Sequence, residues 1–329
     1  MSVVDHAVSG CYPSCNAERA GAVRLASSAV AGAVTWRTWA EALRVHQWLK
    51  NILVFVPLIL AHQVGDFSAL VRCCAGFLLM SAVASATYVL NDLRDIEVDR
   101  LHPSKKARPI AAGLIEPRTA RVVALVIGAT AFALAAILSP QFALVLATYV
   151  GLTLLYTYGL KRIPLLDVAI IGALFSLRVV GGVVLIGAVF SIWLLSFALL
   201  FFFSLALVKR HSELVKMEPG NFGGPSGRGY RREDWPLTLV AGISSGIASL
   251  VIMLLYISDA ESGIGYYARP AWILVIPMAV LLWLLRIWFL AQRGEMHDDP
   301  IVFAIGDRYS WLAAGIAATA FLLAVLRVG

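Results

Sequence analysis

The chain has 329 residues, of which 60% are hydrophobic and only 14% are charged, and its mean hydropathy is +0.82. A water-soluble globule of this length cannot bury so much apolar surface, so the composition predicts a membrane protein. The net charge of +7 does not indicate nucleic-acid binding, because the lysines and arginines lie in short segments between long apolar runs. We therefore expect the membrane bilayer, and no nucleic acid, as a partner.

The first 35 residues carry several charged side chains and no uninterrupted apolar run. A signal peptide or a membrane span would require such a run. We therefore expect a flexible cytoplasmic tail over residues 1–35 and a single transmembrane domain over residues 36–329.

Apolar segments long enough to cross a bilayer as helices, roughly 20 residues each, recur along the rest of the chain. They predict an all-α fold, a polytopic membrane bundle of about nine transmembrane helices. The expected spans are residues 48–64, 71–91, 120–138, 141–159, 164–187, 190–208, 237–257, 271–291 and 309–328.

Basic residues are concentrated in every second loop, namely after the second, fourth and sixth predicted spans. Loops rich in lysine and arginine stay in the cytoplasm, so this pattern predicts a cytoplasmic N-terminus and an active-site cavity that faces the cytoplasm. We expect an integral, multi-pass protein of the bacterial inner membrane.

Carboxylates follow the second span directly, in the sequence NDLRDIEVD at residues 91–99. Asp92, Asp95 and Asp99 are spaced by three and four residues, so on an α-helix they project from one face, with Asn91 beside them. The three charges repel one another, and the C-terminal end of a helix disfavours them further. Because oxygen ligands favour Mg²⁺, we predict a magnesium site here. The alternative is a solvated helix end.

Basic side chains come shortly after these carboxylates. Lys105 and Arg108 would surround an anion held by the metal, and the planar guanidinium of Arg108 suits phosphate oxygens. The alternative is that they only set the membrane orientation.

Arg178 lies inside the predicted fifth span. An arginine at such depth costs several kcal/mol unless it faces a wet cavity or an anion, so we expect it to face a cavity. Tyr156, Glu213 and Tyr230 are further candidates for substrate binding. The alternative is that the tyrosines are interfacial aromatics and that Glu213 pairs with Lys209, four residues earlier on a helix.

The motif NDLRDIEVD resembles the first aspartate-rich motif, N-D-x-x-D-x-x-x-D, of the UbiA-type intramembrane prenyltransferase superfamily, and the helix layout is similar over nearly the whole chain. The resemblance implies a second aspartate-rich motif on a facing helix end, with a magnesium-bound diphosphate between the two. This chain departs from that pattern. The loop after the fourth span contains a single carboxylate, Asp167, and the loop after the sixth reads LALVKRHSEL, which is basic instead of acidic.

The segments RPIAAG, YGLKR, VKRHSEL and RGY resemble the branch of that superfamily that includes decaprenyl-phosphate phosphoribosyltransferases. This resemblance implies that phosphoribosyl pyrophosphate is the donor, a polyprenyl phosphate is the acceptor and Mg²⁺ is the cofactor. The product would supply a lipid-linked pentose (arabinose) donor for cell-surface or exported glycans such as a nodulation factor.

The resemblance implies catalytic roles for Asp92, Asp95, Asp99 and Arg178, with Arg178 reaching the anionic head group of the acceptor. Asn91 and the three aspartates would hold the metal. The basic residues that would bind phosphates are Lys105, Arg108, Lys161, Arg162, Lys209 and Arg210.

Two other functions remain open at this stage. An aromatic, hydroxybenzoate-type prenyltransferase of quinone biosynthesis shares the first motif, although the second aspartate cluster that it needs is missing here. A non-catalytic membrane transporter would use Arg178 along a permeation path, although the sequence has no convincing inverted repeat. The oligomeric state is not predicted.

Overall fold

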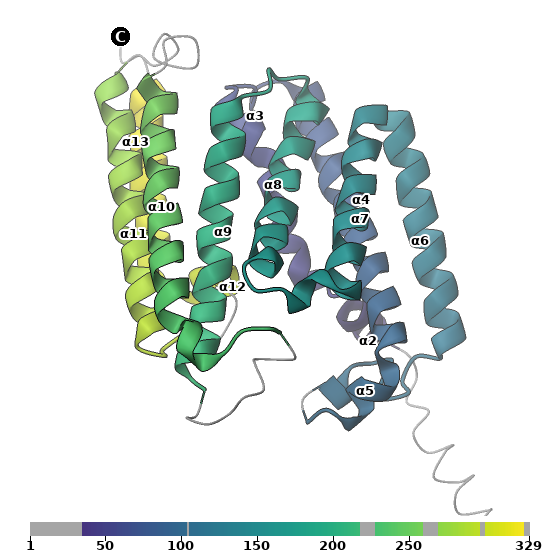
Figure 1. Cartoon of the computed structure of the whole chain (residues 1–329). Helices are drawn as coiled ribbons and strands as arrows, with labels where there is room; N and C mark the ends of the chain where they lie inside the picture. The colour runs from purple at the N-terminus through teal and green to yellow at the C-terminus, as the bar shows by residue number, and fades with distance from the viewer. Residues whose placement is uncertain (1–34, 104, 218–227, 259–268, 297–299, 326–329) are drawn as a thin grey trace, which may run out of the picture.

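The structure is a computed structural model and describes residues 35–103, 105–217, 228–258, 269–296 and 300–325. All regular elements in these ranges are helices (Figure 1). In the described part of the chain, eight helices are long and apolar enough to cross a membrane, and a bent pair of shorter helices makes a ninth span. The predicted all-α, polytopic bundle is confirmed.

The eight long helices correspond to the second to ninth predicted spans, with shifts of a few residues at most ends. The helix α9 is the largest departure, because it continues to Val215, past the predicted end at residue 208. The long helices are α4 (Phe67–Arg94), α6 (Pro117–Leu138), α7 (Pro140–Tyr158), α8 (Leu166–Ile186), α9 (Ile192–Val215), α10 (Trp235–Ser258), α11 (Val275–Gln292) and α13 (Arg308–Val325).

Shorter helical elements connect the long ones. The α-helical pieces are α2 (Trp36–Ala42), α3 (Val56–Leu60), α5 (Ile96–Leu101) and α12 (Pro300–Gly306). The 3₁₀ pieces are η1 (Val45–Phe55), η2 (Lys105–Ala107), η3 (Leu160–Arg162), η5 (Arg232–Asp234) and η7 (Pro270–Leu274).

The first predicted span, residues 48–64, is wrong as a continuous α-helix. The chain instead crosses this region as α2, η1 and α3, with a bend of 58° between α2 and the element that follows. Arg44, between α2 and η1, has the left-handed conformation (φ 51°), which a right-handed helix cannot continue. Pro57, near the start of α3, removes a backbone donor and disfavours an uninterrupted helix through this point.

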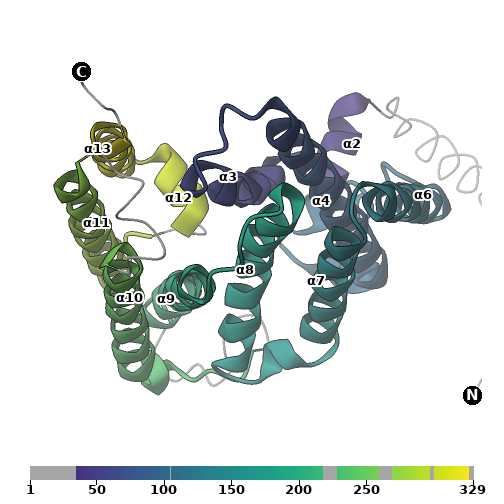
Figure 2. The same ribbon diagram turned by 90° about the horizontal axis from the view of Figure 1, so that it is seen from above.

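The helix α8 lies at the centre of the packing, against α4, α7, α9, η1 and α3 (Figure 2). It is the most buried of the eight spans, since 61% of its most apolar stretch is buried inside the protein. A close approach holds η1 and α3 against it, since a Cβ on Gly182 would lie 2.1 Å from the carbonyl oxygen of Val54. Glycine at this position therefore brings the first span into contact with α8.

Two joins between spans are tight. Ser139 ends α6 and begins α7, and its hydroxyl accepts a hydrogen bond from the backbone N–H of Phe142 at 3.2 Å. Gly187 ends α8 in the left-handed conformation (φ 64°), and Ser191 begins α9 a few residues later. Both joins lie at the end of the bundle opposite to the ends of α4, α7 and α9 (Figure 1).

The polar connections after α4, α7 and α9 all lie at one end of the bundle (Figure 1). This end carries the aspartate-rich motif on α4 and α5. Almost all of the predicted tail, residues 1–34, lies outside the described residues, as does the segment of residues 218–227.

Candidate active site: a cationic pocket beside an aspartate cluster

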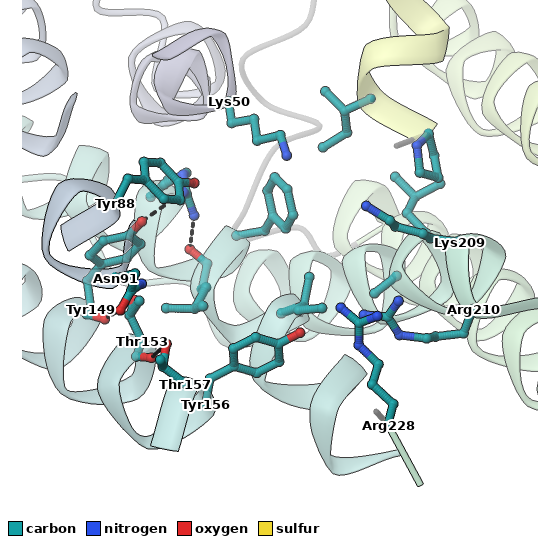
Figure 3. A pocket seen from close by; sticks show the side chains of 18 residues that line it. Lys50, Tyr88, Asn91, Tyr149, Thr153, Tyr156, Thr157, Lys209, Arg210 and Arg228 are labelled. Atoms are coloured by element: carbon teal, nitrogen blue, oxygen red, sulfur yellow. Dashed lines mark hydrogen bonds between the residues drawn. The ribbon is translucent and has the colours of Figure 1, made fainter. Parts of the chain in front are cut away.

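A pocket of about 260 Å³ opens between α4, α7, α8, α9 and α12 (Figure 3). Most of its wall comes from four long helices, while η1 and α12 contribute one or two residues each. The lining residues are Lys50, Tyr88, Asn91, Tyr149, Thr153, Tyr156, Thr157, Ile171, Leu174, Phe175, Arg178, Leu205, Ala206, Lys209, Arg210, Arg228, Pro300 and Ile301.

Five of these lining residues have positively charged side chains, and no lining residue has a carboxylate. We call this space the cationic pocket; its cations are Lys50, Arg178, Lys209, Arg210 and Arg228. Several positive charges facing one another in a partly desolvated space repel, and an anion relieves that repulsion. The lining therefore favours an anionic ligand with several negative charges.

Arg178 is 5% exposed, and its hydrogen-bond partners in the described part of the chain are neutral. Its Nε donates to Asn51 Oδ1 at 2.8 Å, one Nη donates to the carbonyl of Leu174, and the other lies 3.5 Å from the hydroxyl of Tyr149. Its guanidinium carbon also lies 5.1 Å from the ring centroid of Phe175. The positive charge of Arg178 is therefore held in place without a carboxylate partner in that part of the chain.

The orientation of the Asn51 amide is fixed by a chain of hydrogen bonds. The hydroxyl of Ser81 donates to the carbonyl of Phe77 at 2.7 Å, so it accepts the bond from Asn51 Nδ2 at 2.9 Å. This leaves Asn51 Oδ1 to accept from Arg178. Asn51 is 1% exposed, so η1 supports an arginine on α8 through a buried contact.

Arg210 differs from Arg178, because carboxylates neutralise it. Its Nε donates to Asp167 Oδ2 at 2.7 Å, and its Nη1 donates to Glu213 Oε2 at 2.7 Å. The hydroxyl of Tyr230 donates to the other oxygen of Asp167 at 2.6 Å. Burial, together with this hydrogen bond, raises the pKa of Tyr230 above its usual range, so the hydroxyl remains a donor.

Glu213 and Tyr230, both predicted to bind substrate, therefore lie behind the pocket wall and hold Arg210 and Asp167 in place. Glu213 pairs with Arg210 and, at 3.8 Å, with Arg228, and Tyr230 is 2% exposed. Neither lines the pocket. Their contacts make them supports for the charged residues of the wall.

The aspartate-rich motif forms a second charged group at the end of α4. Asp92 Oδ1 accepts hydrogen bonds from Arg44 Nη2 at 2.6 Å and from Arg108 Nη1 at 3.0 Å. Asp99 Oδ2 accepts from the same Arg108 Nη1 at 2.6 Å. We call these four residues the aspartate cluster. It borders the cationic pocket, since Tyr88 lines the pocket while Arg44 lies 4.8 Å from the Tyr88 ring centroid.

The helix that carries the motif is not continuous. It breaks at Asp95, between the end of α4 and the start of α5. Helical spacing nevertheless persists, because the N–H of Asp95 donates to the carbonyl of Asn91 and the N–H of Asp99 donates to that of Asp95. Asp92 and Asp99, two of the three aspartates that were predicted to share one face, thus lie on one side. Arg108 contacts these two carboxylates and does not line the pocket.

The aspartate cluster has the donors that a hard divalent cation requires. Two carboxylate oxygens, from Asp92 and Asp99, converge on a single cationic nitrogen of Arg108. No group of three or more His, Cys, Asp or Glu side chains converges on one point among the described residues. A cation held by these two carboxylates would take its remaining ligands from water and substrate phosphates, which is the usual habit of Mg²⁺. The residues present fit Mg²⁺ in this shared role.

Among the other predicted site residues, the structure brings Asn91, Tyr156 and Lys209 to the pocket wall together with Arg178 and Arg210. Lys105, Lys161 and Arg162 do not line it. Lys105 lies in η2, and Lys161 and Arg162 lie in η3, at the same end of the bundle.

Sequence reasoning missed several residues of the site. Lys50 and Asn51 lie near the start of the first expected span, residues 48–64, which was predicted to be an ordinary helix. The polar residues Tyr149, Thr153 and Thr157 recur every four residues along the apolar helix α7, and this period could have revealed a polar face. Arg44 carries no signal beyond its charge, whereas Arg228 begins the segment RGY, and the resemblance of that segment could have pointed to it.

The fold and the pocket define a multi-pass membrane protein with a cation-lined cavity at one end of its helices. The profile of the UbiA prenyltransferase family matches residues 51–306. The chain belongs to this family, and it is therefore an integral membrane enzyme of the prenyltransferase superfamily.

Three relatives are similar over most of this chain. A Sinorhizobium fredii protein, "Uncharacterized protein y4nM", is 48% identical over 289 residues, which cover 88% of this chain and 56% of that protein, so this chain spans little more than half of its length. The nodulation protein NoeC of Azorhizobium caulinodans is 31% identical over 280 residues, which cover 84% of this chain and 90% of that protein. A decaprenyl-phosphate phosphoribosyltransferase of Mycobacterium tuberculosis is 31% identical over 295 residues, which cover 85% of this chain and 94% of that protein.

Solved structures of the same fold support the assignment. A UbiA homologue from Archaeoglobus fulgidus bound to DMAPP and Mg²⁺ has a TM-score of 0.64 at 18% identity, and the match covers 88% of this chain and all of that chain. At this level of identity the likeness establishes the fold alone.

The ion pair of Arg210 and Asp167 should be essential for folding. Asp167 is 0% exposed, so Arg210→Met leaves a buried carboxylate without its cation, a change that costs about 3–5 kcal/mol. We expect a large drop in the thermal unfolding midpoint of the detergent-solubilised protein. Arg162→Met, at an exposed position on η3, should unfold within about a degree of the wild type. Equal midpoints for Arg210→Met and the wild type would contradict the structural role of the pair.

Proposed function

We propose that this protein is a Mg²⁺-dependent polyprenyl-phosphate phosphoribosyltransferase. It would move phosphoribose from phosphoribosyl pyrophosphate to a polyprenyl phosphate in the membrane. The observation that carries the proposal is the cationic pocket, with five cations and no carboxylate on its wall.

The number of phosphate groups on the substrates distinguishes this reaction from that of an aromatic prenyltransferase. Phosphoribosyl pyrophosphate carries a diphosphate and a 5-phosphate, and the acceptor adds another phosphate. A prenyl diphosphate and an aromatic ring bring only one diphosphate to the site. Charge-assisted hydrogen bonds from arginine and lysine are the strongest contacts available to phosphates, so the cationic lining favours the first pair of substrates. The similarity to the mycobacterial phosphoribosyltransferase supports the same choice.

The transfer breaks the bond between C1 of the ribose and the diphosphate oxygen, and it forms a bond between C1 and an oxygen of the acceptor phosphate. Diphosphate leaves with the bonding electrons. Because the acceptor is already an anion, no strong general base is required. Positive charge develops at C1 as the bond breaks, and residues that fix both anionic substrates make the attack effectively intramolecular.

Arg178 is the residue that we assign to the acceptor phosphate. Its charge faces the pocket from within α8 and is held by neutral partners, so an anionic head group would complete its coordination. Lys50 lies 5.8 Å from the ring centroid of Phe175, the same ring that Arg178 approaches, so these two cations could share one anion.

Asp92 and Asp99, together with the adjacent Asn91 and Asp95, would hold the metal. When bound, Mg²⁺ supplies a Lewis acid that neutralises the charge of the departing diphosphate. Arg44 and Arg108, which contact Asp92, would then lie beside that diphosphate.

The product would be a lipid-linked phosphoribose, a precursor for a pentose (arabinose) added to a cell-surface or exported glycan. The similarity to the nodulation protein NoeC supports a nodulation factor as one such glycan. We also propose that the end of the bundle with the aspartate cluster faces the cytoplasm of a bacterial inner membrane, because the basic connections lie at that end.

A transfer assay tests the function. Purified protein in detergent, with Mg²⁺, radiolabelled phosphoribosyl pyrophosphate and polyprenyl phosphate, should move the label into the organic phase. A parallel assay with geranylgeranyl diphosphate and hydroxybenzoate should give no prenylated ring. A prenylated ring without lipid-linked pentose would contradict the proposal and favour the aromatic prenyltransferase. No product in either assay would favour a transporter.

Asp92→Asn should abolish metal-dependent transfer. The substitution removes one of the two converging charges, and the stabilisation of a leaving group by a metal is worth several kcal/mol, so the rate should fall at least about a hundredfold. Stabilisation of the protein against heat by Mg²⁺ and diphosphate should be lost as well. Glu97→Gln is the matched control, because this exposed carboxylate on α5 makes a surface pair with Arg100 at 3.3 Å. Near-wild-type turnover of Asp92→Asn at saturating Mg²⁺ would refute the metal site.

A further inference from the structure

Arg228, just before η5, has an unusual environment in the wall of the cationic pocket. Its Nε is buried and has no hydrogen-bond partner in the described part of the chain. A buried donor without a partner is destabilising, so such groups are rare unless a ligand satisfies them. The charge of Arg228 is also only weakly compensated, since its Nη1 lies 3.8 Å from the Glu213 oxygen that Arg210 already binds at 2.7 Å.

The backbone that follows Arg228 is anchored by close contacts. A Cβ on Gly229 would lie 2.4 Å from the carbonyl oxygen of Arg162, which shows how closely this segment packs on the connection between α7 and α8. The hydroxyl of Tyr230 accepts a hydrogen bond from the N–H of Leu165 at 2.8 Å and donates to Asp167. The next two residues thus hold the arginine against the pocket.

The two ends of the pocket differ in their chemistry. Asn91 and Tyr88 lie at the end next to the aspartate cluster, and Lys209, Arg210 and Arg228 lie at the opposite end (Figure 3). The hydroxyl of Tyr156 points toward the space beside Arg210 and Arg228. Asp167 and Glu213 neutralise Arg210, whereas Arg228 is only weakly compensated, and Lys209 lies in the same part of the wall.

We propose that Arg228, with Lys209, forms a phosphate subsite that binds the 5-phosphate of the sugar donor and selects donors that carry a second phosphorylated end. The inference rests on the proposed function. A donor with its diphosphate at the aspartate cluster would place its other phosphate toward Arg228. A prenyl diphosphate has no group for this end of the pocket, so Arg228 is a specificity-determining residue.

Equilibrium binding of two small anions tests the two ends of the pocket independently, and it does not require turnover. We would titrate ribose 5-phosphate, and separately Mg²⁺ with pyrophosphate, into the purified full-length protein and its variants by calorimetry. Arg228→Ala should weaken binding of ribose 5-phosphate by about ten- to a hundredfold, the usual range for a lost charge-assisted contact. Binding of pyrophosphate should change by less than about threefold. The affinity of Arg228→Lys for ribose 5-phosphate should fall between those of Arg228→Ala and the wild type, because lysine keeps the charge but lacks the planar guanidinium.

Arg231→Ala is the matched control, since this exposed arginine is three residues away and does not line the pocket. It should bind both anions as the wild type does. Unchanged binding of ribose 5-phosphate to Arg228→Ala would overturn the subsite, as would no binding to the wild type or an equal loss for both anions. If the subsite behaves as described but the wild type transfers no phosphoribose, the proposed reaction fails while the subsite stands.

Discussion

The buried ion pair of Arg210 and Asp167 is the interaction on which the site depends. It joins α8 to α9 where both charges are almost fully removed from water, and Tyr230 and Glu213 complete it. Buried charges are tolerated only when they are paired and hydrogen-bonded, and this network meets that condition. The same contacts fix the segment that carries Arg228, so one pair orders the connection between α7 and α8, the end of α9 and the start of α10.

Differences in pairing decide which cations can bind a ligand. Carboxylates neutralise Arg210, whereas Arg178 is held by an amide, a carbonyl and a phenol, and Arg228 by a distant carboxylate. At the other end, Arg108 draws Asp92 and Asp99 together at close range. The pocket thus lies between a pair of converging carboxylates, suited to a metal, and a group of cations, suited to phosphates. Substrates with several phosphates match this arrangement.

The sequence was sufficient for the spans, the aspartate-rich motif and the cavity position of Arg178, because these depend on hydropathy and on helical spacing. It was insufficient for the first span, where Arg44 and Pro57 break the helix and the 3₁₀ segment presents Asn51 to Arg178. It also did not separate binding residues from supporting ones. Arg210 and Tyr230 have residue types typical of a phosphate site, and only their long-range contacts with Asp167, across 43 and 63 positions, reveal the supporting role. Such contacts leave no local pattern.

The central claim is that the cationic pocket binds a donor with two phosphorylated ends in preference to a prenyl diphosphate. Equilibrium binding of the purified protein, with Mg²⁺ present, measures this directly when phosphoribosyl pyrophosphate and geranylgeranyl diphosphate compete for the site. The account predicts that phosphoribosyl pyrophosphate binds more tightly and displaces geranylgeranyl diphosphate, and that its affinity falls as salt is added. Tight binding of geranylgeranyl diphosphate that phosphoribosyl pyrophosphate cannot displace would contradict it.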